Sequence, residues 1–111
     1  VVPCYKQMNR IQLSEFSQYL ISNDFIYFCF VNDGITDGKQ KILVDFVNHN
    51  PERSQLFNLS KNQGKAEAVR QGVNTLLKSS KLKLVGYLDA DLAENRTEDR
   101  SFIHKFKIIY Y

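Results

Sequence analysis

An uninterrupted apolar run over residues 25–31 constrains the fold more than any other feature of the chain. It has the length of a strand, and it carries aromatic and β-branched side chains with no alternating polar residues. This pattern predicts burial on both faces, as in a parallel sheet covered by helices. Asn32, Asp33 and Gly34 follow the run and end the strand. No apolar window approaches the ~18 residues that a membrane-spanning helix needs, so a spanning segment is excluded.

The segments around this run alternate between extended and helical patterns. We expect strands over residues 1–2, 25–31, 55–59 and 82–88, and helices over residues 9–22, 37–48, 64–77 and 96–107. Pro3 ends the first strand, and Asp37 with Gln40 forms a capping box for the second helix. Ala66 lies on the inward face of the third helix. The order predicts an α/β fold, a Rossmann-like parallel sheet with helices on both faces and strand order 3-2-1-4.

Composition narrows the classes of function. A chain of 111 residues allows one domain, residues 1–111, and 43% hydrophobic residues is ordinary for a globular protein. Fifteen Lys and Arg against 12 Asp and Glu give a net charge of +3, which is too small and too scattered for a nucleic-acid-binding surface. Cys4 and Cys29 form neither a zinc motif nor a disulfide framework, so we expect buried, inert thiols in a reducing, cytoplasmic compartment.

A loop segment with at least one polar side chain follows each of the four predicted strands. These segments are Pro3-Cys4-Tyr5, Asn32-Asp33-Gly34, Asn62-Gln63-Gly64-Lys65 and Asp89-Ala90-Asp91. Because the carboxyl ends of parallel strands meet at one edge, these loops converge, and ligands of such sheets bind there beside the point where the strand order reverses.

Asp89 and Asp91 lie two positions apart at the end of a strand, so extended geometry points both carboxylates to one side. A hard divalent cation relieves their mutual repulsion, and Mg²⁺ typically takes one or two protein carboxylates together with phosphate oxygens. A solvated turn that carries two acids explains the same residues without a metal.

Gly64 and Lys65 open the third helix. A lysine there opposes the helix dipole, and a phosphate bound at the helix end would make it favourable, while Gly64 allows close approach to the backbone. An exposed, solvated lysine is the alternative. The segment is neither a Walker A motif nor a G-x-G-x-x-G fingerprint, so it gives no support for NAD.

Other polar residues carry a weaker signal. Asp37 is expected to cap a helix, whereas Asp33 has no capping role and is the better candidate to hydrogen-bond a base or ribose. Tyr5 either stacks on a base or covers the sheet, and Arg70 either reaches the sheet edge or is solvated. His49 is expected at the surface.

Together these segments resemble family 2 inverting glycosyltransferases of the GT-A fold. The nearest likeness is to enzymes that transfer a sugar from a nucleotide donor to dolichyl or polyprenyl phosphate. The resemblance rests on four motifs in order over residues 1–92: Val1-Val2-Pro3-Cys4-Tyr5, Phe30-Val31-Asn32-Asp33-Gly34-Ile35-Thr36-Asp37-Gly38, Asn62-Gln63-Gly64-Lys65-Ala66-Glu67-Ala68-Val69-Arg70-Gln71-Gly72 and Gly86-Tyr87-Leu88-Asp89-Ala90-Asp91-Leu92.

The resemblance implies roles for the matching residues. Pro3 and Tyr5 line the base, Asp33 hydrogen-bonds it, and Gly64, Lys65 and Arg70 lie near the donor. Asp89 and Asp91 form a D-X-D element that holds the ribose and a Mg²⁺ or Mn²⁺ ion on the diphosphate. The implied reaction is displacement at the anomeric carbon with inversion, in which the metal stabilises the departing nucleoside diphosphate.

The chain also departs from the family pattern. Lys6-Gln7-Met8 replaces an acidic segment, Ile35 stands where serine is usual, and the catalytic base and acceptor site are expected downstream of residue 111, so no catalytic residue is assigned. Both ends look cut, and the isolated chain is expected to bind donor without transfer.

Two functions follow from this interpretation. The first is a metal-dependent inverting glycosyltransferase that uses a UDP- or GDP-sugar and acts on a polyprenyl phosphate or glycan in cell-envelope synthesis, with peripheral membrane contact through further segments. The alternative is a non-catalytic nucleotide-binding α/β domain with an interaction or regulatory role. The apolar end, residues 108–111, is expected to form a sheet or homodimer contact.

Overall fold

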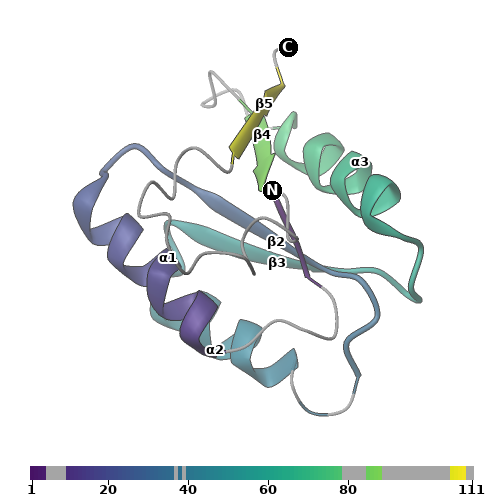
Figure 1. The fold of residues 1–111 in the computed structure, drawn as a ribbon, viewed down its shortest axis with the longest axis horizontal. Coiled ribbons are helices and arrows are strands. Elements are labelled where there is room, and N and C mark those ends of the chain that lie inside the picture. The colour runs from purple at the N-terminus through teal and green to yellow at the C-terminus, as the bar shows by residue number, and fades with distance from the viewer. Residues whose placement is uncertain (5–9, 37, 39, 79–84, 89–105, 110–111) are drawn as a thin grey trace.

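The computed structural model describes residues 1–4, 10–36, 38, 40–78, 85–88 and 106–109, and all structural statements below concern these residues. Figure 1 shows an α/β arrangement in which helices cover both faces of a sheet. The elements are β1 (Val2–Cys4), α1 (Arg10–Ser22), β2 (Phe28–Asn32), α2 (Gln40–His49), β3 (Ser54–Asn58), α3 (Lys65–Leu76), β4 (Val85–Leu88) and β5 (Phe106–Ile109).

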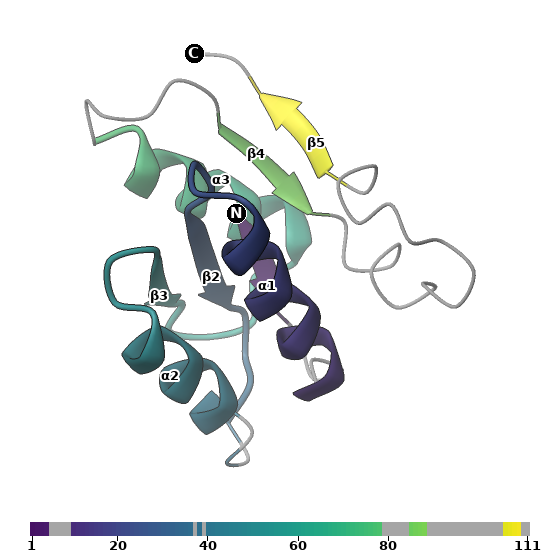
Figure 2. The ribbon, with the colours of Figure 1, turned by 90° about the vertical axis from the view of Figure 1, so that its left-hand side faces the viewer.

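Strands β1, β2 and β3 form a parallel sheet with β2 in the centre. This confirms the 3-2-1 part of the predicted strand order. Strand β4 pairs with β5 in a second, antiparallel sheet, and the Val1 nitrogen donates to the Gly86 carbonyl at 2.8 Å, which holds β4 beside the start of β1. Figure 2 shows β4 and β5 next to α3, away from α2.

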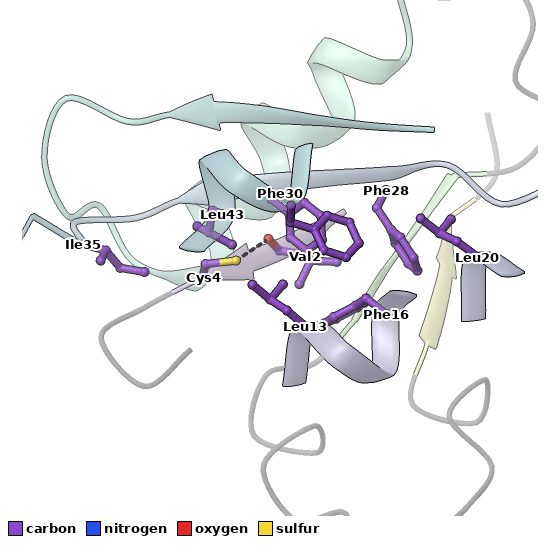
Figure 3. Packing of buried hydrophobic residues seen from close by; sticks show 10 residues of the cluster. Val2, Cys4, Leu13, Phe16, Leu20, Phe28, Phe30, Ile35 and Leu43 are labelled. Atoms are coloured by element: carbon purple, nitrogen blue, oxygen red, sulfur yellow. Dashed lines mark hydrogen bonds between the residues drawn. The ribbon is translucent and has the colours of Figure 1, made fainter. Parts of the chain in front are cut away.

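The central strand separates two hydrophobic clusters, because its side chains point alternately to opposite faces. Phe28 and Phe30 pack with α1 and α2, whereas Cys29 and Val31 pack with α3. In the first cluster the ring of Phe16 lies edge-on to Phe28 and Phe30, at centroid distances of 4.9 and 5.4 Å (Figure 3). Both faces of β2 are therefore buried, as the apolar run predicted.

Helix α3 packs closely on the other face of the sheet through a small residue. A Cβ atom at Gly72 would lie 2.6 Å from Val1 Cγ1 and 2.9 Å from Val31 Cγ2, distances that atoms do not tolerate without movement. Ala68 and Leu76 are buried on the same side. Ala66 is exposed, so its predicted inward position is wrong and the buried face begins at Ala68.

The central strand begins later than the apolar run suggested. Phe25 is 99% exposed and precedes β2, so its predicted place in the strand is wrong. The guanidinium of Arg53 explains why: it donates to the carbonyls of Leu20, Asn23 and Ile26 and so holds the end of α1 and the following residues in a turn.

Two other predicted boundaries are corrected. Pro3 does not end the first strand but lies within β1, in register with Val31. Phe106 and Lys107 belong to β5 and not to a final helix, while the rest of that predicted helix lies outside the described residues. Ile108 and Ile109 pair with β4, so the apolar end makes a sheet contact.

None of the helices in the described part of the chain is both long and apolar enough to cross a membrane.

Candidate functional site

Asp33 links the carboxyl end of β2 to the beginning of α3. Its side chain is almost fully buried, at 1% exposure, and its two carboxylate oxygens accept the backbone N–H groups of Gln63 and Gly64 at 2.7 and 3.1 Å. Its own N–H donates to the Cys4 carbonyl at 2.9 Å, which ties in β1 as well. Asp33 therefore holds the loop before α3 and does not cap the helix itself, as the sequence predicted, and it joins three of the predicted donor-binding segments.

Two glycines with positive φ let these loops pack together. Gly64, at φ +93°, is the residue directly before α3, and its carbonyl accepts the N–H of Ala68 in the first turn. Gly34, at φ +100°, leaves room for Asn62, because a Cβ there would lie 3.0 Å from Asn62 Cβ. Both positions lie in the left-handed region, which only glycine enters at little cost. The backbone at this edge is thereby set by the sequence itself.

The charge at the start of α3 follows from this arrangement. A carboxylate stabilises a helix N-terminus, and here Asp33 supplies that charge while occupying two N–H groups just before the helix. Among the described residues at this helix end, the groups that suit a phosphate are then the amides of the first helical turn and the side chain of Lys65, which is half-buried at the first position of α3. The structure thus brings Asp33, Gly64 and Lys65 together, as the converging loops predicted.

A polar network connects the carboxyl ends of β2 and β3. Asn32 is buried; its Oδ1 accepts the Ile35 N–H at 2.8 Å, and its Nδ2 donates to the Ile35 carbonyl at 3.2 Å and to Asn58 Oδ1 at 3.1 Å. The Leu59 N–H donates to the Asn32 carbonyl at 3.0 Å. Ile35 itself is buried in the cluster with α1 and α2 (Figure 3), so the network anchors the loop after β2 to the core.

Arg70 lies on the exposed side of α3 in a bidentate pair with Glu67. Its Nε and Nη2 donate to the two Glu67 oxygens at 2.8 and 2.6 Å, and the side-chain amide of Gln71 donates to Glu67 at 2.8 Å. The hydrogen bonds from Arg70 and Gln71 lower the pKa of Glu67 to about 2. In this arrangement Arg70 binds within α3, and a donor would have to compete with Glu67 for its guanidinium.

The remaining predicted site residues are placed as follows. Pro3 is fully buried within β1. Tyr5, Asp37, Asp89 and Asp91 lie outside the described residues. Within the described ranges no three His, Cys, Asp or Glu side chains are grouped so as to hold a metal ion. The predicted metal ligands are therefore still a prediction from sequence.

The two thiols are buried, as expected. Cys4 and Cys29 are free, and burial raises the pKa of both. The Cys4 Sγ donates to the Val2 carbonyl at 3.3 Å (Figure 3). His49 is exposed on α2, where its Nδ1 lies 2.7 Å from the Asp45 carbonyl.

Comparison with known proteins decides the family. The family model for glycosyl transferase family 2 matches residues 1–107. The chain belongs to glycosyl transferase family 2. Neither a curated protein nor a solved structure gave a significant match.

The family gives the chain a general activity. This family 2 chain is a glycosyltransferase domain, and its α/β sheet agrees with the N-terminal part of a GT-A fold. Members of the family are generally inverting and act on a nucleotide-sugar donor and an acceptor. The carboxyl edge of β1, β2 and β3 is therefore the candidate donor site of this glycosyltransferase.

Sequence reasoning missed Asn58 at this edge. A single asparagine at the end of a short strand is common beside turns and gave no signal. Its register opposite Asn32 became visible only when β2 and β3 were paired.

Proposed function

We propose that this chain supplies the nucleotide-sugar site of an inverting glycosyltransferase that uses a UDP- or GDP-linked donor. The observation that carries the proposal is the double hydrogen bond from Gln63 and Gly64 to the Asp33 carboxylate. It fixes the loop before α3 against the end of β2, so that Gly64 and Lys65 lie at the same edge as the β1 and β2 loops. A preformed edge of this kind binds an extended ligand with little ordering cost.

The roles of individual residues extend the proposal. The base lies near Pro3, Tyr5 and the Asp33 loop, and the diphosphate lies toward Gly64 and Lys65. In this scheme Asp33 acts mainly by holding the loop, because both of its oxygens already accept backbone N–H groups. Arg70 contributes only if it leaves Glu67.

Asp89 and Asp91 are proposed to hold a Mg²⁺ or Mn²⁺ ion at the end of β4. Carboxylates after a strand suit both ions, and the ion would neutralise charge on the leaving diphosphate. The proposal rests on the sequence alone, since both residues lie outside the described ranges. The acceptor is proposed to be a polyprenyl phosphate or a glycan, with transfer at the cytoplasmic face of a membrane and completed by downstream segments.

Titration of the chain with nucleotides tests donor binding directly. We expect UDP or GDP to bind with a Kd of about 1 mM or lower in the presence of Mn²⁺, and binding to weaken when the metal is removed by chelation. Asp91→Asn should abolish the metal dependence, whereas Asp45→Asn on the outer surface of α2 should leave it unchanged. If neither nucleotide binds with Mn²⁺ present, the proposal is wrong. If binding is equally strong without the metal, the metal has no part in the proposed donor site.

A further inference from the structure

Asn32 has an amide orientation that the backbone determines. Its Oδ1 faces a backbone N–H and its Nδ2 faces a backbone carbonyl, both of Ile35. A carbonyl oxygen only accepts and an N–H only donates, so exchanging the Asn32 oxygen and nitrogen would break both bonds. The second hydrogen of Asn32 Nδ2 consequently points toward Asn58 at 3.1 Å.

This orientation is passed on to Asn58. Because Asn32 presents a donor, the atom of Asn58 that faces it must be the oxygen, and the Asn58 amide nitrogen must point away. Asn58 is exposed at the end of β3, in register with Asn32 and so beside the residue that precedes Asp33. Its NH₂ group makes no hydrogen bond to the described residues. The edge of the sheet therefore carries an exposed amide whose outward group is fixed as a donor.

A fixed donor distinguishes two classes of nucleobase. Uracil and guanine carry an exocyclic carbonyl, which accepts a hydrogen bond, whereas cytosine and adenine carry an exocyclic amino group in the corresponding place. An NH₂ group that Asn32 holds in this orientation pairs with the first class and opposes the second. A freely rotating asparagine would pair with either.

We propose that Asn58 selects the base of the donor nucleotide by donating to the carbonyl at C4 of uracil or C6 of guanine, and so favours these bases over cytosine or adenine, which carry an amino group there. The inference rests on the proposed function, because it needs the base to lie at the carboxyl ends of β2 and β3. It gives a role to Asn58, a residue outside the four motifs that carry the family resemblance.

The test compares UDP with CDP, two nucleotides that differ in the exocyclic group at C4. Asn58→Asp keeps an oxygen facing Asn32 but turns the outward donor into an acceptor. The wild-type chain should bind UDP about tenfold more tightly than CDP, and Asn58→Asp should bring this ratio to one or below. The added charge acts on the diphosphate of both ligands alike, so the ratio isolates the effect on the base.

Asn74→Asp is the matched control, because it adds the same charge on the exposed surface of α3. It should keep the wild-type ratio. A thermal melt of each variant checks that the fold is retained, and an NMR signal shift of the Asn58 amide protons on adding UDP provides a readout independent of the substitutions.

The outcomes separate the two proposals. If the wild-type chain binds UDP and Asn58→Asp leaves the ratio unchanged, the role of Asn58 is wrong while donor binding stands. Equal binding of UDP and CDP by the wild-type chain also overturns the role of Asn58. If no nucleotide binds to the wild-type chain, the proposed function is wrong and the inference falls with it.

Discussion

Replacing Asp33 is expected to destabilise the fold, because its carboxylate holds the loop before α3. In Asp33→Ala both N–H groups, of Gln63 and Gly64, lose their carboxylate acceptor. Each is a hydrogen bond to a charged group, worth about 1.5–3 kcal/mol, and each loss should lie near the lower end because water can reach the exposed Gln63 and the half-buried Gly64. The Gly64 N–H has a second acceptor in Asn62 Oδ1 at 3.2 Å, which reduces its loss. We therefore expect about 2–4 kcal/mol for the alanine variant.

Asp33→Asn separates hydrogen bonding from side-chain volume. The asparagine retains one oxygen, so one N–H stays paired while the other faces an NH₂ group, and we expect about 1–3 kcal/mol. For a domain whose total stability is about 5–15 kcal/mol, both variants should still fold.

Urea denaturation followed by circular dichroism measures these losses, with Asp24→Asn as the control at an exposed turn position. Hydrogen exchange of the Gln63 and Gly64 amides shows whether the stability is lost at this loop. Exchange should accelerate at these two amides in Asp33→Ala and remain slow in the wild-type chain. Unchanged stability together with unchanged exchange in Asp33→Ala would refute the argument that this carboxylate holds the loop.

Three further predictions concern the rest of the fold. Hydrogen bonds from Arg70 and Gln71 lower the pKa of Glu67 to about 2. The ionised Glu67 therefore stabilises the fold above the ordinary pKa of 4.5, and this contribution is lost as the pH falls toward 2. An NMR titration should find the lowered pKa of Glu67, and Arg70→Met should raise it. Gly72→Ala should destabilise the chain by about 1–3 kcal/mol through overpacking, less about 1 kcal/mol gained in helix propensity, as measured by urea denaturation. Stability above the wild-type level would contradict the close packing of α3. Cys4 and Cys29 should resist iodoacetamide in the native chain and react after denaturation, and mass spectrometry that shows rapid native labelling would contradict their burial.

The sequence predicts the centre of the fold well, and the reason is local. The side chains of residues 28–31 are apolar on both faces of one strand, and this pattern alone requires helices above and below. Parallel pairing with β1 and β3 then follows from the alternation of helix and strand. The 3-2-1 order and the convergence of Asp33 with Gly64 and Lys65 were accessible in this way.

The sequence predicts element ends less well, because distant residues decide them. The start of β2 depends on Arg53, which binds carbonyls around 30 positions earlier in the chain. Phe106 and Lys107 form a strand because β4 offers an unpaired edge, although their spacing also fits a helix. The inward face of α3 is set by how closely Gly72 approaches Val31, a contact that hydrophobic periodicity does not weigh.

A residue distant in sequence also determines the charge at the start of α3. From sequence alone, a lysine in the first helical turn is unfavourable unless a phosphate binds beside it. The structure shows that Asp33 already places a carboxylate at this helix end, so the position of Lys65 does not by itself require a bound anion. A diphosphate entering this edge meets this carboxylate, and an accompanying cation would offset the repulsion between the two. Donor binding should therefore depend on a divalent cation more strongly than the lysine alone would suggest, which is why the titration with and without Mn²⁺ is the decisive measurement for this site.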